Sequence, residues 1–200
     1  MKFYRIRRAE FWGDLSEPLV CGLTSDKGRT SNGRLHLERT GPFVPPIMVS
    51  AYILVSDNFR PRVLERFPEV SFEETFLAKI VELHWEKWDR HEKPIIWPKG
   101  PDPNDYIILE PNAPELLEKI PTIWEVLMDQ GAHSTFVPGP SGKRLDKVLV
   151  LDPGSWNGND LFWIRPRSFD IPIVTESAKE WLEETVAEWG SFEEVATHSF

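Results

Sequence analysis

The side chains best suited to chemistry do not form a known catalytic pattern. Val137–Arg144 reads VPGPSGKR, which has some features of a phosphate-binding loop. The Walker pattern requires a glycine five positions before Gly142 and a serine or threonine after Lys143. Val137 and Arg144 occupy those positions, so neither the tight turn nor the magnesium-binding hydroxyl is supplied. We interpret this stretch as a surface turn.

The histidines and the single cysteine are also poorly placed for a reactive centre. His84 and His91 enclose Glu86 and Asp89, but their spacing is not the i, i+4 spacing of a helical metal-binding pair. Cys21 is the only thiol, and it would need a nearby histidine and a lowered pKa to act as a nucleophile. We therefore assign no catalytic residues, no metal and no cofactor, and expect a protein that is not an enzyme.

One polar loop could bind a ligand. Ser155–Asp160 (SWNGND) places an aromatic ring among amides and a carboxylate, an arrangement that could hold a sugar. Asn157-Gly158 between two apolar runs is, however, a strong turn signal. We favour a turn in which Trp156 packs sideways.

The elements that position this loop lie between Val148 and Val195. Three apolar runs predict strands on either side of it, because β-branched residues favour the pleated sheet: Val148–Leu151, Leu161–Arg165 and Ile171–Val174. Thr175 can then cap a helix by accepting a hydrogen bond from a backbone N–H group in its first turn. The helix is predicted to end at Gly190, in the C′ position, before a returning strand, Ser191–Val195.

The predicted helix has one apolar face, formed by residues at helical spacing: Ala178, Trp181, Leu182, Val186 and Trp189. We expect Trp181 to lie in the core. The same order of strand, helix and strand occurs in Tyr52–Glu74, and both copies end in Ser-Phe-Glu-Glu, at Ser71–Glu74 and Ser191–Glu194. The position matching Trp181 is predicted near Val63 or Leu64, and the first helix near Ser56–Phe67.

These patterns predict an α+β fold with mixed or antiparallel sheets, in which one compact domain, 1–200, contains two related strand–helix–strand units. The units span about 48–90 and 147–196, and a proline-rich segment, 94–112, joins them. The remaining predicted strands are an outer strand at Lys2–Arg7 with a solvated arginine face, a strand in preference to a helix at Phe76–Trp88, and a short strand at Tyr106–Leu109. Loops are predicted at Thr24–Asn32 and Gly131–Lys143. A helix is predicted over Glu115–Asp129, where Pro121 divides it and Thr122 caps the second piece.

The order of these pieces resembles a family of bacterial immunity proteins from polymorphic-toxin systems, best known from myxobacteria. The likeness is most specific in Val148–Val195, where a strand into Leu-Asp precedes a polar loop, Asp-Leu-Phe-x-x-Arg, Ile-Val-Thr-Glu and an amphipathic helix. Met1–Ile6 and Ile53–Phe72 resemble its opening and middle. Many family members carry a double CxxCG motif, whereas this chain has only Cys21, so the zinc role implied for that subgroup is absent here.

Composition limits the classes of partner. The net charge is −9 and the sequence pI about 5.1, whereas nucleic-acid-binding proteins normally carry a basic patch. The chain has one cysteine, no evident signal peptide and no apolar run of membrane-spanning length, so we expect a cytoplasmic protein without a nucleic-acid or membrane partner. Nine tryptophans exceed what one small core readily needs, and exposed tryptophan is a frequent interface anchor.

The resemblance implies that the chain binds and neutralises a cognate toxin protein, and a nuclease toxin would offer a basic active-site surface. The alternative is a small hydrolase or carbohydrate-binding protein that uses the loops at 97–105 and 155–160. The expected partner-binding residues combine aromatic anchors with acidic and amide side chains on those loops: Trp97, Asp102, Asp105, Trp156, Asn157 and Asp160.

Overall fold

The C-terminal unit forms as the sequence predicts. We describe a computed structural model of the chain, for residues 1–9, 17–82, 103–141 and 147–199. The unit consists of β10 (Lys147–Leu151), a short 3-10 turn η5 (Pro153–Ser155), β11 (Leu161–Ile164), β12 (Ile171–Thr175), α3 (Glu176–Val186), a second 3-10 turn η6 (Ala187–Trp189) and β13 (Gly190–Thr197). The Thr175 hydroxyl caps α3 by accepting a hydrogen bond from the Ala178 backbone N–H, as predicted.

Gly190 does not have the predicted C′ role. Its φ of −146° is extended, and it is the first residue of β13, after η6 has continued the helical path beyond Val186. No left-handed residue is needed there, because the chain passes directly from a helical turn into a strand.

The N-terminal strand β1 (Phe3–Arg8) lies at the centre of a sheet, so the prediction of an outer strand was wrong. The sheet order is β11-β12-β1-β13-β10-β9, and β1 is antiparallel to both of its neighbours. Phe3, Tyr4 and Ile6 are buried, which places apolar side chains on both faces of the strand. Its basic residues misled the prediction because they cluster toward the exposed end of a strand that is otherwise enclosed.

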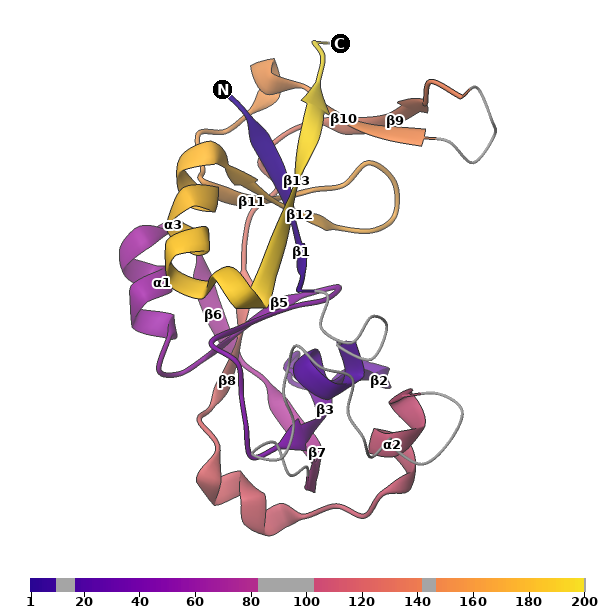
Figure 1. Ribbon diagram of the computed structural model, residues 1–200, viewed down its shortest axis with the longest axis vertical. Helices are drawn as coiled ribbons and strands as arrows, with labels where there is room; N and C mark the ends of the chain where they lie inside the picture. Colours follow the sequence, from indigo (N-terminus) through magenta and orange to yellow (C-terminus); the bar gives the residue numbers. More distant parts are fainter. Residues whose placement is uncertain (10–16, 83–102, 142–146, 200) are drawn as a thin grey trace.

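The N-terminal unit forms a second sheet of order β4-β5-β8-β6 (Figure 1). Its elements are β4 (Ile47–Val49), β5 (Ile53–Ser56), α1 (Arg60–Arg66), β6 (Ser71–Glu74) and β8 (Ile123–Leu127). Helix α1 begins at Arg60 and has Pro61 in its first turn. The predicted helix after Thr122 is instead strand β8, because pairing with β5 on one side and β6 on the other outweighs local helical preference.

The two units have the same topology and register. In each, two parallel strands joined by a helix enclose an antiparallel strand from elsewhere in the chain: β8 between β5 and β6, and β1 between β12 and β13. Glu73 of the first Ser-Phe-Glu-Glu lies opposite Glu125 of β8, and Glu193 of the second lies opposite Arg5 of β1. The repeated tetrapeptide therefore occupies equivalent positions in both sheets.

An acid, an aromatic ring and a cation recur at equivalent positions. In the first unit, the Trp124 indole N–H donates to Asp57 Oδ1 at 2.8 Å, and the guanidinium of Arg60 lies 4.0 Å from the Trp124 ring centroid. In the second, the Tyr4 hydroxyl donates to Glu176 Oε1 at 3.4 Å, and Lys179 Nζ lies 5.2 Å from the Tyr4 ring centroid. This correspondence aligns buried Val63 with buried Leu182, one position from the predicted match with Trp181.

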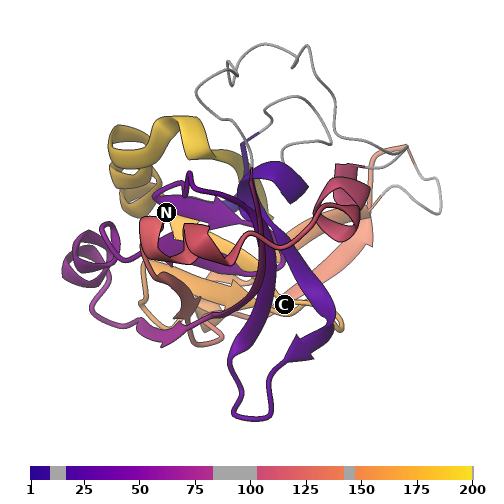
Figure 2. The ribbon, with the colours of Figure 1, turned by 90° about the horizontal axis from the view of Figure 1, so that it is seen from below.

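A third sheet, of order β2-β3-β7, forms an arm beside the first unit. It contains β2 (Leu23–Arg29), β3 (Leu35–Gly41) and β7 (Phe76–Glu82), and the β2–β3 hairpin projects downward in Figure 2. The predicted loop at Thr24–Asn32 was wrong, because polar β2 is held by its pairing with buried β3. The predicted strand is confirmed for Phe76–Glu82, and its continuation to Trp88 lies outside the described residues.

Three helical segments complete the described chain: η2, a π-type turn (Glu17–Cys21), α2 (Pro103–Leu109) and a 3-10 turn η4 (Pro114–Lys119). The predicted strand at Tyr106–Leu109 was wrong, because these residues continue a helix that starts at Pro103, where proline is well tolerated. Buried Ile107 shows that the apolar run serves a helix face.

The main core lies between the two units, where α1 and α3 lie side by side (Figure 1). Trp181 packs against this core but is half-buried, not fully buried as expected. Its ring stacks on Phe59 at 5.9 Å and meets the edge of Phe67 at 5.4 Å between centroids. Trp181 therefore joins the two helices at the margin of the core.

A second, smaller core lies on the other face of the six-stranded sheet, around Phe3 and Phe162. Strand β9 (Ser134–Pro138) pairs with β10, so the loop predicted over Gly131–Lys143 was wrong for these five residues. Just before β9, the Gly131 N–H donates to the Trp163 carbonyl oxygen of β11 at 2.9 Å. The segment from Gly131 through β9 therefore hydrogen-bonds to β10 near one edge of the six-stranded sheet and to β11 at the other edge. This segment encloses the second core.

We expect Gly131→Ala to destabilise the protein by roughly 1–3 kcal/mol, because it overpacks this core. An added Cβ would lie 2.3 Å from the Phe162 ring, which is fully buried and cannot turn away. Urea unfolding of both proteins measures the difference. Gly154→Ala is the matched control, since its nearest contact is Asp152 Oδ1 at 3.2 Å on the surface. Equal stability of Gly131→Ala and wild type would show that the second core is loosely packed.

Candidate protein-binding surface

Four of the six predicted partner-binding residues are described by the structure. Trp97 and Asp102 lie outside the described residues. Asp105 is half-buried in α2, on a different part of the molecule from the loop that contains Trp156, Asn157 and Asp160.

The loop at 155–160 is held in a fixed shape by local hydrogen bonds. Trp156 is half-buried, with its ring edge-on to Phe3 at 5.7 Å and its indole N–H donating to the Asn159 carbonyl oxygen at 2.8 Å. The Asn157 N–H donates to the Gly131 carbonyl oxygen, while its side chain is exposed and accepts from the Asn159 N–H. The turn interpretation is confirmed, and Asn157 is the loop's exposed polar group.

Asp160 connects the two units. Its Oδ2 lies 2.8 Å from Arg66 Nη2 of α1, and its Oδ1 accepts from the Thr175 hydroxyl at the start of α3 at 2.5 Å. Burial alone would raise the pKa of Asp160, but the hydrogen bonds from Thr175 and Arg66 and the arginine charge outweigh it, so the pKa is lowered. Asp160 is therefore a partnered acid beside the N-terminal end of α3.

We expect Asp160→Asn to remove part of the protein's acid-dependent stability. A carboxyl group whose folded-state pKa is lowered stabilises the fold fully above its unfolded-state value, here near 3.8, and loses that contribution as the pH falls through the folded-state pKa. The stability difference between wild type and Asp160→Asn should thus be present at pH 7 and shrink below pH 4. Chemical denaturation across this range measures it. A difference that does not change with pH would contradict the pairing with Arg66.

The outer face of α3 carries the densest run of acids on a described helix. The exposed acids of α3 and η6 are Glu176, Glu180, Glu183, Glu184 and Glu188. Lys179 lies on the same helix, and its Nζ pairs with Glu183 Oε2 at 2.6 Å. At the N-terminal end, Arg66 of α1 donates to the Ser177 hydroxyl at 3.0 Å. Glu176 suits the positive N-terminal end of the helix dipole, but the last turn contains no basic residue, and acids there are unfavourable. The sequence signal for this face is the helical spacing of these glutamates.

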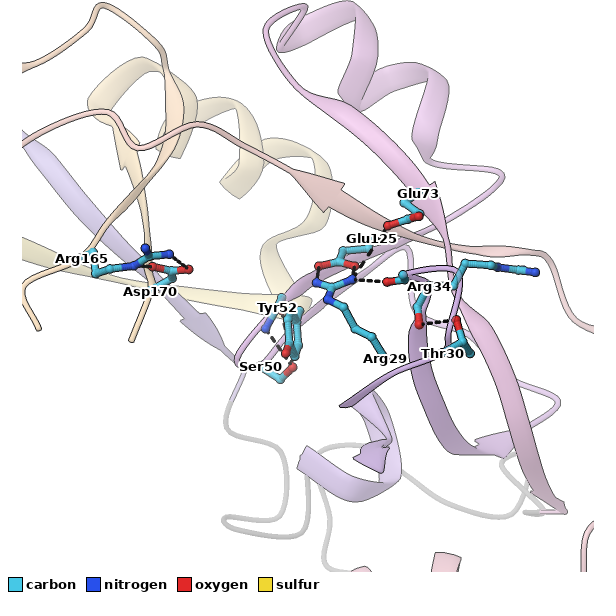
Figure 3. A network of polar contacts seen from close by, with 10 residues as sticks. Arg29, Thr30, Arg34, Ser50, Tyr52, Glu73, Glu125, Arg165 and Asp170 are labelled. Atoms are coloured by element: carbon cyan, nitrogen blue, oxygen red, sulfur yellow. Dashed lines mark hydrogen bonds and ion pairs between the residues drawn. The ribbon is translucent and has the colours of Figure 1, made fainter. Parts of the chain in front are cut away.

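A second polar cluster, drawn in Figure 3, joins the arm to the first unit. Two nitrogens of Arg29 each lie 2.7 Å from one oxygen of Glu125, whose side chain is only 5% exposed. Arg29 also lies 3.9 Å from Glu73, which faces Glu125 across the sheet. Hydrogen bonding to Glu125 raises the pKa of Arg29. Sequence reasoning missed this cluster, because its residues lie far apart in the chain.

The residues considered above for catalysis or metal binding form no reactive site in the part of the chain that the structure describes. Cys21 is buried, and its thiol donates to the Val49 carbonyl oxygen at 3.5 Å. Within the described ranges, no three His, Cys, Asp or Glu residues gather in a metal-binding arrangement. His84, Glu86, Asp89 and His91 fall outside those ranges, as do Gly142–Arg144 of the phosphate-loop-like stretch.

Two surface hollows lie away from the loop at 155–160. One, of about 340 Å³, lies between the start of β7 and the segment before β8 and contains Arg34, Glu74 and Phe76. The other, of about 460 Å³, lies along the arginine-bearing end of β1. Neither is lined by Asp160, so neither matches the site expected for a hydrolase or sugar-binding protein.

Comparison with family models, curated proteins and solved structures finds no match to this chain. None of the helices in the described ranges combines the length and apolar character needed to cross a membrane. The molecule is an α+β protein of two topologically equivalent units with an acidic helix face at their junction.

Proposed function

We propose that this chain is a cytoplasmic immunity protein that binds and neutralises a cognate bacterial toxin domain. The observation that carries the proposal is the acidic outer face of α3, with five exposed glutamates and one lysine, Lys179. The likeness of Val148–Val195 to the immunity family supports it, because α3 and its capping residue lie in that segment.

The charge pattern of α3 favours a basic partner. Glutamates at i, i+4 spacing, such as Glu176 with Glu180 and Glu180 with Glu184, repel one another by a few tenths of a kcal/mol per pair. A basic surface would relieve this repulsion on binding. A nuclease toxin has such a surface in its substrate groove, and complementary charge accelerates association.

The loop at 155–160 extends this surface at the N-terminal end of α3. Asp160 Oδ2 lies 3.4 Å from the hydroxyl of Ser177 in the first turn, and exposed Asn157 adds amide groups that can donate or accept hydrogen bonds. We therefore retain Asn157 and Trp156 as contact residues at the rim and assign to Asp160 the role of fixing the loop against the helix.

Size-exclusion chromatography of the purified chain mixed with the product of the adjacent gene tests this function. We expect a stoichiometric complex that elutes earlier than either component. Asn157→Ala keeps the backbone hydrogen bond from residue 157 to Gly131 and changes only the rim of the proposed toxin-binding surface. Glu180→Lys with Glu184→Lys changes the centre of that surface. Separate elution of folded wild type and toxin domain would contradict the proposal.

A further inference from the structure

A basic groove lies on the second unit of this acidic protein. It runs along the end of β1 beside the turn between β4 and β5, and has a volume of about 460 Å³. Its lining includes Arg5, Arg7 and Arg8 of β1, together with Asp170 and Phe169, which is 49% exposed.

Arg5 and Arg7 of this groove differ in how closely a carboxylate approaches the guanidinium. The Arg7 guanidinium lies 3.0 Å from Glu193, and Asp170 is held by two hydrogen bonds from Arg165 at 2.6 and 2.8 Å. The guanidinium of Arg5 makes no hydrogen bond or ion pair within the described part of the chain. Partial burial and the charge of Arg7 lower its pKa, and Glu193 opposes this only in part.

The position in the first unit that is equivalent to Arg5 forms an ion pair with a residue from another strand. Arg5 of β1 corresponds to Glu125 of β8, since each lies opposite the third residue of a Ser-Phe-Glu-Glu strand. At Glu125, Arg29 at the end of strand β2 supplies the opposite charge through a bidentate pair. At Arg5 the charge is reversed. Glu193 of β13 lies opposite Arg5, but its close ion pair is with Arg7, and no residue in the described part of the chain forms a bidentate pair with Arg5.

We propose that the groove at Arg5 binds an extended acidic segment of a partner protein, whose carboxylate pairs with Arg5 as Arg29 pairs with Glu125. The planar guanidinium accepts a carboxylate through two parallel hydrogen bonds, a geometry this chain forms at both Arg29 and Arg165. Arg7 and Arg8 add positive field, and exposed Phe169 offers an apolar contact to a neighbouring side chain. This site is separate from the acidic face of α3 and has the opposite charge preference.

Fluorescence anisotropy of a labelled hexaglutamate peptide tests the groove with the full chain. A net charge of −9 repels this peptide overall, so saturable binding at low salt requires a local basic site. We expect wild type to bind, and Arg5→Gln to weaken binding by at least about tenfold. Chemical shifts of backbone amides should change in β1 and around Phe169.

Matched variants separate the groove from general charge effects. Arg62→Gln removes the same charge from exposed α1, and its dissociation constant should stay within about twofold of wild type. Arg7→Gln, at a more exposed position of β1, repeats the test if Arg5→Gln does not fold, with an expected loss of several-fold. The assignment is overturned if wild type does not bind the peptide, if Arg62→Gln weakens binding as much as the groove variants, or if inorganic pyrophosphate binds as tightly as the peptide.

Discussion

Arg29→Ala is expected to lower the free energy of unfolding by roughly 2–4 kcal/mol. Removing one partner of a buried ion pair leaves the other charge buried without compensation, which typically costs 3–5 kcal/mol. The lower range applies because Arg29 is 39% exposed although Glu125 is only 5% exposed. The cost is increased by Glu73, which faces Glu125 across the sheet and would then repel it. Urea denaturation at neutral pH measures the loss.

The chain provides a matched control for this prediction. Arg165 and Asp170 form a bidentate pair of the same geometry, drawn in Figure 3, but both side chains are exposed. Arg165→Ala should therefore cost less than about 1 kcal/mol. Adding Glu125→Leu to Arg29→Ala should restore part of the lost stability, because the buried charge is removed. Equal small losses for both arginine variants would show that Glu125 is solvated and that the arm is held by other contacts.

Charge reversal on α3, by Glu180→Lys with Glu184→Lys, is expected to slow association with the toxin about tenfold or more at low salt. Exposed charges on an interface steer the encounter of the two proteins, and the difference in association rate should narrow as salt screens the field. The fold should be retained, because replacing repelling glutamates on an exposed helix is neutral or slightly stabilising. Stopped-flow or surface-binding kinetics at two ionic strengths measure both rates.

Glu115→Lys with Glu118→Lys changes the net charge equally on exposed η4, away from α3. This variant should associate nearly as fast as wild type. If both double variants slow association alike, the toxin responds to net charge alone and the face of α3 has no special role.

The second unit was predictable because its signals are local. Thr175 follows a β-branched run and precedes a helical apolar pattern, so the strand, cap and helix are specified within a short segment. The exposed turn at Asn157-Gly158 was recognised for the same reason. The repeat was visible because both copies keep the same tetrapeptide at an equivalent register.

The remaining elements depend on partners distant in sequence. Strand β1 is central because β12 and β13 return to enclose it, and β8 is a strand because β5 and β6 flank it. Likewise, Arg29 and Glu125 are 96 positions apart, and no local pattern predicts their meeting. Arg39 is fully buried in β3, with burial lowering its pKa to about 10, although its sequence context resembles an exposed strand position.

The candidate site was predicted only in part. In the loop at 155–160, Asn157 is exposed and Trp156 is anchored by its contact with Phe3 and its hydrogen bond to Asn159. Asp160 contacts Arg66 of the other unit. That contact could not be expected, because the packing of α1 against α3 places them together. The acidic face of α3 was predictable from helical spacing. The acids in its last turn indicate a binding surface only once the structure shows that this face is exposed.

Growth of bacteria that co-express this chain with the adjacent toxin gene tests the central claim most directly. The account predicts that wild type restores growth, and that Glu180→Lys with Glu184→Lys protects less than wild type at equal levels of folded protein. Arrested growth in the presence of abundant, folded wild-type protein would contradict the account.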